Sequence, residues 1–319
     1  MTVLITCLTW YFSVMGATLS SSKSLIFSLI CITVFTLLYS GGLDYEAYSN
    51  VVSRLDFNHV NPERLSLYIY SFFFGTITVD VMKIIALPIY FLSIDTFARR
   101  KLRFSKYQRI LMHLFMFMIP LGYIAALTVF RQTLALSFLL LMLSSKFWLS
   151  KTSLFVASAI HHLSFPLAYI AVKTERYYAV LWLIMLFSFI IFADIIGIYE
   201  SFKKLDFSRS YSYFLFLISI FFTLMALLNI KKNKILLLNL FALLIISATV
   251  IFKFLPADLV TRSGNYFVIP LTVSLARFTS GLSHKYNTRV IVVVCILTCL
   301  ATPILIFDRP EYHLAISAL

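Results

Sequence analysis

The chain has 319 residues, of which 61% are hydrophobic and only 13% are charged. A soluble domain of this size would lack the polar surface that keeps it in water, so the composition excludes that class. The net charge of +14 does not indicate a nucleic-acid partner, because the basic residues fall in short loops between apolar segments, where membrane orientation requires them.

Apolar segments recur along the whole chain, each with about the 17–20 residues that a helix needs to cross a bilayer core of roughly 30 Å. We therefore expect an all-α polytopic membrane protein with about 10–12 transmembrane helices. Residues 1–319 would form one integral membrane domain. Residues 1–19 lack a basic segment before them and are interpreted as a retained first helix.

A basic run between residues 99 and 109, with no acid inside it, sets the orientation. The positive-inside rule places this loop in the cytoplasm. Alternation then predicts a span over 78–96, an external loop over 41–64 and Arg131 at the external end of a later span.

The next crossing is ambiguous. If residues 152–171 crossed the membrane completely, the later basic clusters would all lie outside. A helical hairpin or broken helix near His162–Pro166 keeps them inside, and Pro166 favours such a break. With this hairpin, the segments near 198–210 and 255–265 become external loops.

Polar side chains converge on the external side in this topology, as a binding site requires. They are Asp44, Tyr45, Tyr48, Glu63, Arg131, His161, His162, Arg262 and Tyr266. Arg131 and the histidine pair carry most weight, because an Arg at a bilayer centre costs about 2.5–3.5 kcal/mol.

Structural interpretations compete with this one. Arg131 and Arg262 also suit snorkelling at the membrane interface. Tyr45 and Tyr48, at i and i+3 on one helix face, also suit an aromatic belt. The histidine pair, with Ser164, also suits a helix-packing contact.

The sequence contains none of the common motifs for a metal or nucleotide, such as HExxH or a glycine-rich phosphate loop. The four cysteines lie in apolar segments and are interpreted as small buried hydrophobes. We therefore expect no metal and no cofactor.

Four short motifs, in order, are similar to those of the EpsG/Wzy-like family of bacterial polysaccharide (O-antigen) polymerases. Leu43-Asp44-Tyr45-Glu-Ala-Tyr48 resembles its Asp-Tyr-x-x-Tyr element, and Asn61-Pro-Glu63 resembles the Glu-containing element that follows. Phe130-Arg131-Gln132-Thr-Leu-Ala135 resembles its Arg-Gln-x-x-Ala helix start. Ala159-Ile-His161-His162-Leu-Ser164 resembles its Ala-x-x-His-x-x-Ser element. The family's arginine before Asp-Tyr is replaced here by Gly41, Gly42 and Leu43.

This resemblance implies a glycosyltransferase C-like fold in the bacterial inner membrane, with its active site facing the periplasm. The substrates would be oligosaccharide repeat units carried on undecaprenyl diphosphate. A chain-length regulator protein and membrane lipids are the further partners considered.

The residues suggest roles in such a reaction. A metal-independent transferase needs a fixed cation to offset charge on the departing diphosphate, which fits Arg131 first and Arg262 second. Asp44 or His161 would take the proton from the acceptor hydroxyl. Tyr45, Tyr48 and Tyr266 would stack on sugar rings, with Glu63, Gln132, His162 and Ser164 as further substrate contacts.

Other functions stay open at this point. A lipid-linked oligosaccharide flippase or transporter is one, although the sequence has no internal repeat around a midplane site. An O-antigen ligase or a membrane acyltransferase is another. A non-catalytic membrane scaffold, which would tolerate substitution of Arg131 and His161, is the third.

Overall fold

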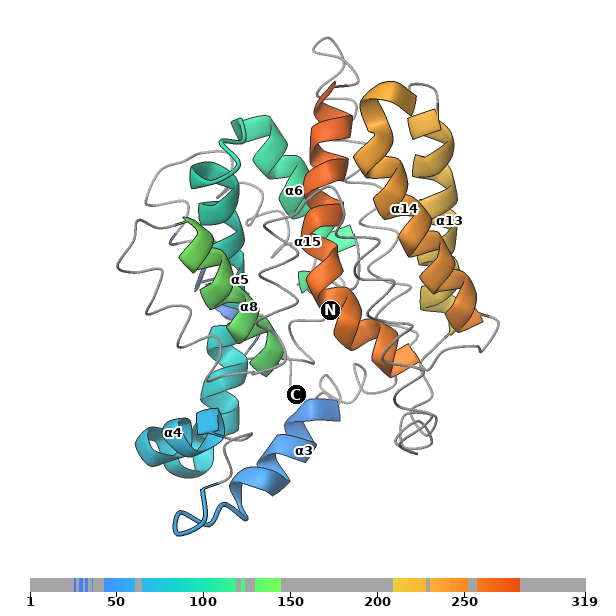
Figure 1. Cartoon of the computed structure of the whole chain (residues 1–319). Coiled ribbons are helices and arrows are strands. Elements are labelled where there is room, and N and C mark those ends of the chain that lie inside the picture. The colour runs from blue at the N-terminus through green and yellow to red at the C-terminus, as the bar shows by residue number, and fades with distance from the viewer. Residues whose placement is uncertain are drawn as a thin grey trace.

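The computed structural model describes residues 43–60, 65–118, 122–123, 130–144, 209–227, 230–251 and 257–281, with a few single positions between 26 and 36. Its elements are α3 (Leu43–Val52), α4 (Leu65–Phe74), the 3-10 turn η2 (Gly75–Ile77), α5 (Thr78–Arg100), α6 (Lys106–Met118), α8 (Phe130–Ser144), α13 (Arg209–Leu227), α14 (Ile230–Ile251) and α15 (Ala257–Gly281). All are helical, so the all-α prediction is confirmed for this part of the chain (Figure 1).

One stretch of the described chain is long and apolar enough to cross a membrane. It covers the 34 residues Leu67–Arg100, and two shorter apolar helices cover Phe130–Ser144 and Lys234–Ile245. Helix α5 starts at Thr78, where the sequence predicted a span over 78–96. The number of crossings stays a prediction, as does the hairpin near His162–Pro166, which lies outside the described residues.

The turn between α5 and α6 is closed by local hydrogen bonds that the sequence encodes. The α5 helix ends where the Lys101 amide donates to the Phe97 carbonyl over 2.9 Å. Helix α6 then begins with a capping box: the Gln108 amide donates to Ser105 Oγ over 3.3 Å, and the Ser105 amide donates to Gln108 Oε1 over 3.1 Å. These reciprocal bonds satisfy amides that a helix start leaves without partners.

Side-chain contacts fix the direction of the helices relative to one another. Gln108 Nε2 in α6 donates to Ser280 Oγ in α15 over 3.1 Å, and Thr272 Oγ1 of α15 lies 3.5 Å from the sulfur of Met116. The two helices are therefore antiparallel. Helices α13 and α14 pack as neighbours, and α14 packs on α15, where Asn239 Nδ2 donates to Ser274 Oγ over 3.2 Å.

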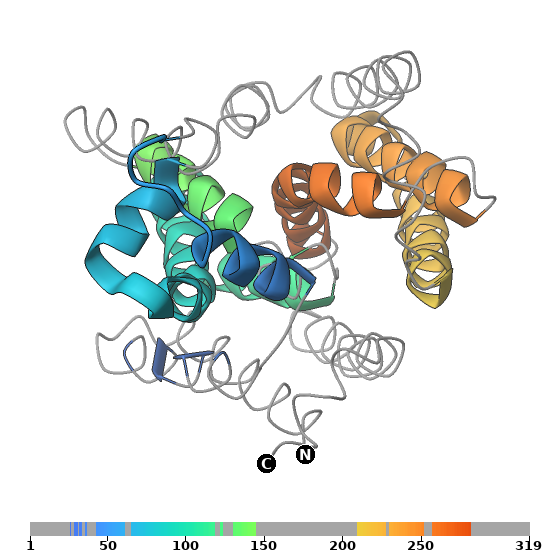
Figure 2. The ribbon, with the colours of Figure 1, turned by 90° about the horizontal axis from the view of Figure 1, so that it is seen from below.

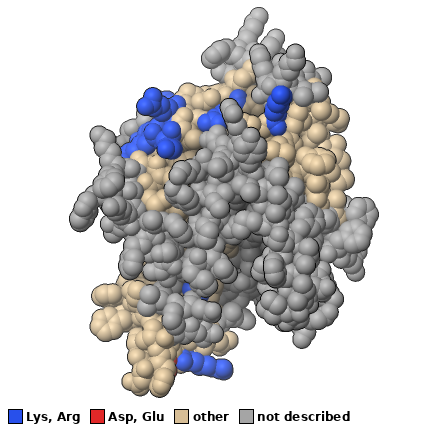
Figure 3. Space-filling model, viewed as in Figure 1, with Lys and Arg blue, Asp and Glu red and all other residues tan. Residues whose placement is uncertain are grey.

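As a result, the end of α5, the start of α6, the start of α14 and the end of α15 lie at one end of the molecule (Figure 1). This is the end that the positive-inside rule assigns to the cytoplasm. Lys and Arg side chains gather there in the space-filling view (Figure 3). The membrane side of this end and the hairpin topology both stay predictions.

The start of α8 lies at the opposite end, together with α3, α4 and the start of α5, and α5 and α8 run in the same direction. Figure 2 shows α3 and α4 across this end. An apolar cluster joins the four helices, with the tyrosines of α3 packed against it. Its buried members are Leu67, Val79, Met82, Ala86, Phe130, Leu134 and Ala135.

Two segments predicted as external loops contain helix. Helix α3 occupies residues 43–52 of the segment 41–64, and α15 begins at Ala257, inside the segment 255–265. For α3 the reason is visible, because Tyr45 and Tyr48 face the apolar cluster from one side of the helix. Of the segment 198–210, only the start of α13 at Arg209 lies within the described residues.

Candidate functional site

The candidate site lies where α3 crosses the start of α8 and the start of α5. The sequence builds this junction from three local features. Helix α8 opens with Phe130, Arg131 and Gln132, all buried. Helix α3 presents Tyr45 and Tyr48, and the first turn of α5 contains Asp80.

Arg131 is held against an aromatic ring at this junction. Its guanidinium carbon lies 5.1 Å from the centre of the Tyr48 ring, and the residue is only 9% exposed. The Tyr48 ring in turn meets Phe130 edge to face, with ring centres 5.1 Å apart. A cation over an aromatic face is stabilised by the ring's quadrupole, which offsets part of the cost of burying the Arg131 guanidinium.

A second aromatic–cation pair lies one turn earlier on α3. The Tyr45 hydroxyl donates to Asp80 Oδ1 over 2.7 Å, and Lys83 Nζ lies 5.4 Å from the centre of the Tyr45 ring. The hydrogen bond to Asp80, together with burial, raises the pKa of the Tyr45 hydroxyl above its usual value. The phenol therefore remains protonated as a donor at neutral pH.

The junction thus combines two cations, one carboxylate and two tyrosine rings. The partial positive charge at the start of α8 adds to that of Arg131. Such a surface suits an anion next to a polar, ring-shaped group. Cations and helix amides hold phosphate oxygens, while tyrosine faces and a carboxylate suit sugar rings and hydroxyls.

The structure brings three of the residues predicted for the site, Tyr45, Tyr48 and Arg131, to this junction, and Gln132 is buried next to Arg131 in α8. Asp44 lies in α3, and Arg262 and Tyr266 lie in the first half of α15, which starts at the same end of the molecule (Figure 1). For these three only the helix backbone is described. Glu63, His161, His162 and Ser164 lie outside the described residues, so their place stays a prediction.

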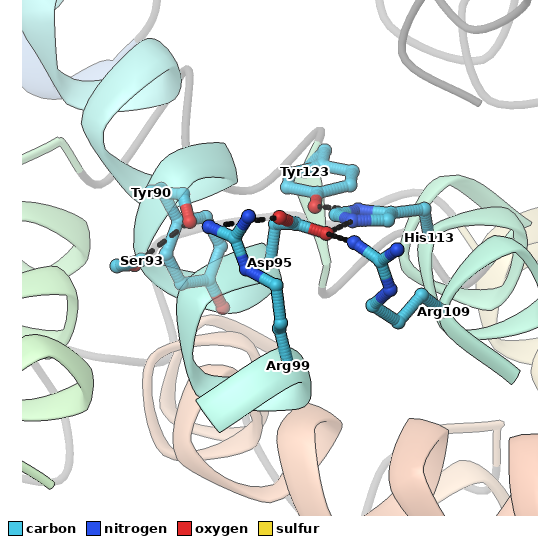
Figure 4. Close-up of polar contacts among 7 residues, drawn as sticks. All are labelled: Tyr90, Ser93, Asp95, Arg99, Arg109, His113 and Tyr123. Carbon is cyan, nitrogen blue, oxygen red and sulfur yellow. Dashed lines mark hydrogen bonds and ion pairs between the residues drawn. The ribbon is translucent and has the colours of Figure 1, made fainter. Parts of the chain in front are cut away.

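A second polar cluster lies near the opposite end, between α5 and α6 (Figure 4). Asp95 forms an ion pair with Arg109, with Nη1 and Oδ1 3.0 Å apart. Nε2 of His113 lies 3.5 Å from the same oxygen, and Arg99 Nη2 lies 3.8 Å from the other. Nδ1 of His113 is 2.6 Å from the Tyr123 hydroxyl.

This second cluster is almost completely buried. The side chains of Asp95 and Arg109 are 7% and 6% exposed, and that of His113 is 0% exposed. The His113 ring stacks on Phe91, with centres 4.6 Å apart. Its Nδ1 is within hydrogen-bond distance of the Tyr123 hydroxyl, whereas its Nε2 approaches the Asp95 carboxylate without a hydrogen bond to it. The cluster therefore ties α6 and Tyr123 to α5 through one carboxylate.

The sequence interpretation did not assign Asp80, Lys83 or the Asp95 cluster to a site. Signals for the cluster were present in the helical spacing. Asp95 and Arg99 are four residues apart, as are Arg109 and His113, so each pair shares a helix face. An acid inside an apolar segment also marks a position that needs a partner, but only the packing shows that the two faces meet.

Among the described side chains, no three His, Cys, Asp or Glu residues gather closely enough to hold a metal ion. Comparison of the chain with protein-family models, curated proteins and solved structures gives no significant match. The similarity to polysaccharide polymerases therefore rests on the four sequence motifs alone.

Proposed function

We propose that the chain is a polytopic inner-membrane glycosyltransferase that polymerises oligosaccharide repeat units carried on undecaprenyl diphosphate, at the periplasmic face. The proposal includes a glycosyltransferase C-like arrangement of about 10–12 transmembrane helices. The observation that carries it is the position of Arg131. This cation is nearly buried at the start of α8 and packed on Tyr48, at the end of the molecule opposite the basic loop.

The roles follow from the chemistry of the transfer. The bond between the growing glycan and its diphosphate carrier breaks while a hydroxyl of the incoming unit attacks the anomeric carbon. Arg131 would hold the departing diphosphate with its planar fork of donors, and Lys83 would add a second positive charge nearby. Tyr48 packs on the guanidinium and would orient it, and Tyr45 and Tyr48 would stack on a sugar ring.

The proton of the attacking hydroxyl needs an acceptor. Asp44 and His161 remain the candidates from the sequence, and the geometry adds Asp80, a half-buried carboxylate that accepts from Tyr45. A carboxylate held by a tyrosine at this junction can orient an acceptor hydroxyl or take its proton. Asp80→Asn would keep the size of the side chain and remove this basicity.

The test is the glycan profile of a deletion strain complemented with variants. Arg131→Ala and Arg131→Lys should both remove long chains and leave single repeat units, because Lys keeps the charge but not the bidentate geometry. Arg54→Ala is the matched control, since Arg54 is an exposed arginine after α3. This variant should give the wild-type distribution of glycan chain lengths.

The profile also separates the competing functions. Loss of a flippase removes even single repeat units from the outer face, and loss of a ligase leaves long polymer on the carrier lipid. Full-length chains from Arg131→Ala, at an unchanged protein level, would remove Arg131 from the mechanism and favour a scaffold.

A further inference from the structure

Helix α4 presents a row of large apolar side chains on its outer face. Ile69, Phe72 and Phe73 are 46%, 76% and 73% exposed, and their spacing of three and four residues places them on one side of the helix. The rings of Phe72 and Phe73 meet edge to face, with centres 5.4 Å apart. In Figure 3 the α4 region lies at the lower left, where most of the described surface belongs to residues that are neither basic nor acidic.

The inner face of the same helix packs on protein. Leu67 is completely buried in the cluster that also holds Phe130, and the Tyr68 hydroxyl donates to the His59 carbonyl over 3.1 Å. The segment 65–77 contains no charged residue. A helix without charges that carries large apolar side chains on its exposed face as well as on its packed face is typical of a hydrocarbon environment rather than of water.

The level of α4 relative to the bilayer follows from α5. The 23 residues of α5 are about 35 Å long as a helix, which is enough to cross a hydrocarbon core of roughly 30 Å. The exposed Arg99 and Arg100 close α5 at one end. At the other end, Gly75 adopts a φ of +56° and turns the chain. The last turn of α4, which precedes Gly75, therefore lies where the hydrocarbon core ends.

We propose that α4 lies in the outer-leaflet interface, with Ile69, Phe72 and Phe73 inserted among the acyl chains of membrane lipids close to their headgroups. The adjoining loop fits this depth, because Asp56 and His59 are exposed and would face water. Aromatic side chains favour this zone of a bilayer. The inference rests on the membrane placement of α5 in the proposed function, and not on glycosyl transfer.

This contact would also position the candidate site. The outer face of α4 holds lipid, while its inner face contributes Leu67 to the cluster beneath α3 and the start of α8. The depth of Arg131 and Tyr48 in the membrane is thereby fixed to that of the headgroups. A diphosphate attached to a lipid carrier would lie at the same level.

The experiment replaces single residues of the full-length protein with the photoreactive residue benzoylphenylalanine. The protein is reconstituted in vesicles of phosphatidylethanolamine and phosphatidylglycerol, irradiated and analysed by mass spectrometry. Position 73 is the test, position 59 in the exposed loop is the negative control, and position 221 is the positive control. Phe221 lies in α13 and is 50% exposed.

We expect phospholipid adducts at positions 73 and 221 and none at position 59. Fragmentation should place the adduct of position 73 on acyl carbons near the glycerol. A lipid adduct at position 221 without one at position 73 overturns the proposal for α4 but not the membrane placement of the protein. A crosslinked protein dimer through position 73 has the same consequence, as does attachment of position 73 near the terminal methyl of a lipid acyl chain. Absence of lipid at both positions overturns the membrane placement itself.

Discussion

Replacement of Asp95 by Asn should strongly destabilise the protein, because it removes the carboxylate around which α5 and α6 are joined. Asp95 and Arg109 are both almost fully buried, with the charged atoms 3.0 Å apart. At an effective dielectric constant of about 20, their attraction is about 5 kcal/mol. Removing one partner leaves a buried charge without compensation, which costs about 3–5 kcal/mol.

The contacts of the other residues in the cluster predict which variant loses more stability. Arg109→Met leaves Asp95 next to His113 and the half-exposed Arg99, so this variant should lose less stability than Asp95→Asn. The double variant should lose less unfolding free energy than the two single variants lose together, with a coupling energy of about 2 kcal/mol. A neutral pair in place of a buried ion pair leaves no isolated charge.

The assay is unfolding of the purified protein in mixed micelles by titration with sodium dodecyl sulfate, followed by circular dichroism. Asp56→Asn is the matched control, because Asp56 pairs with His59 on the surface, and it should unfold like the wild type. If Asp95→Asn unfolds within about 1 kcal/mol of the wild type, the cluster does not join the helices, and the reasoning from burial is refuted.

Three further changes test local features. Gly75→Ala should cost about 1 kcal/mol of unfolding free energy, because φ is +56° and a Cβ there strains the backbone while meeting no neighbour within 4 Å. Ser105→Ala should cost about 1 kcal/mol through loss of the α6 cap, whereas the neighbouring Lys106→Ala should not. Tyr45→Phe should abolish the pH dependence of stability that arises from the raised Tyr45 pKa. The hydrogen bond to Asp80 stabilises the protein fully below pH 10, the unfolded value, and is lost as pH rises through the higher folded pKa; an unchanged alkaline profile in Tyr45→Phe would contradict this assignment.

The sequence predicted the features that depend on hydropathy and on loop charge. The start of α5 near residue 78 and the start of α8 at Arg131 follow from the edges of apolar segments. The shared face of Tyr45 and Tyr48 follows from helical periodicity. The placement of Arg131 at the end opposite the basic loop follows from alternation alone, and the helix directions agree with it.

The sequence could not predict which partner each buried polar group would find. Lys83 lies within the predicted span 78–96, but its position over the Tyr45 ring depends on how α3 rotates against α5. Asp95 meets Arg109 and His113 only because α6 packs beside it. The turn at Gly75 was not predicted, because the segment 65–77 contains no charged residue and hydropathy does not show that a separate helix, α4, precedes α5.

Polymerisation by the purified protein is the most direct test of the central claim. The full-length chain would be reconstituted in vesicles and supplied with undecaprenyl-diphosphate-linked repeat units, and the products would be separated by length. We predict a ladder of carrier-linked glycans from the wild type, the same ladder from Arg54→Ala, and single repeat units only from Arg131→Ala. A wild-type protein that leaves the intact substrate as single units, or an Arg131→Ala variant that produces the ladder, would contradict the account.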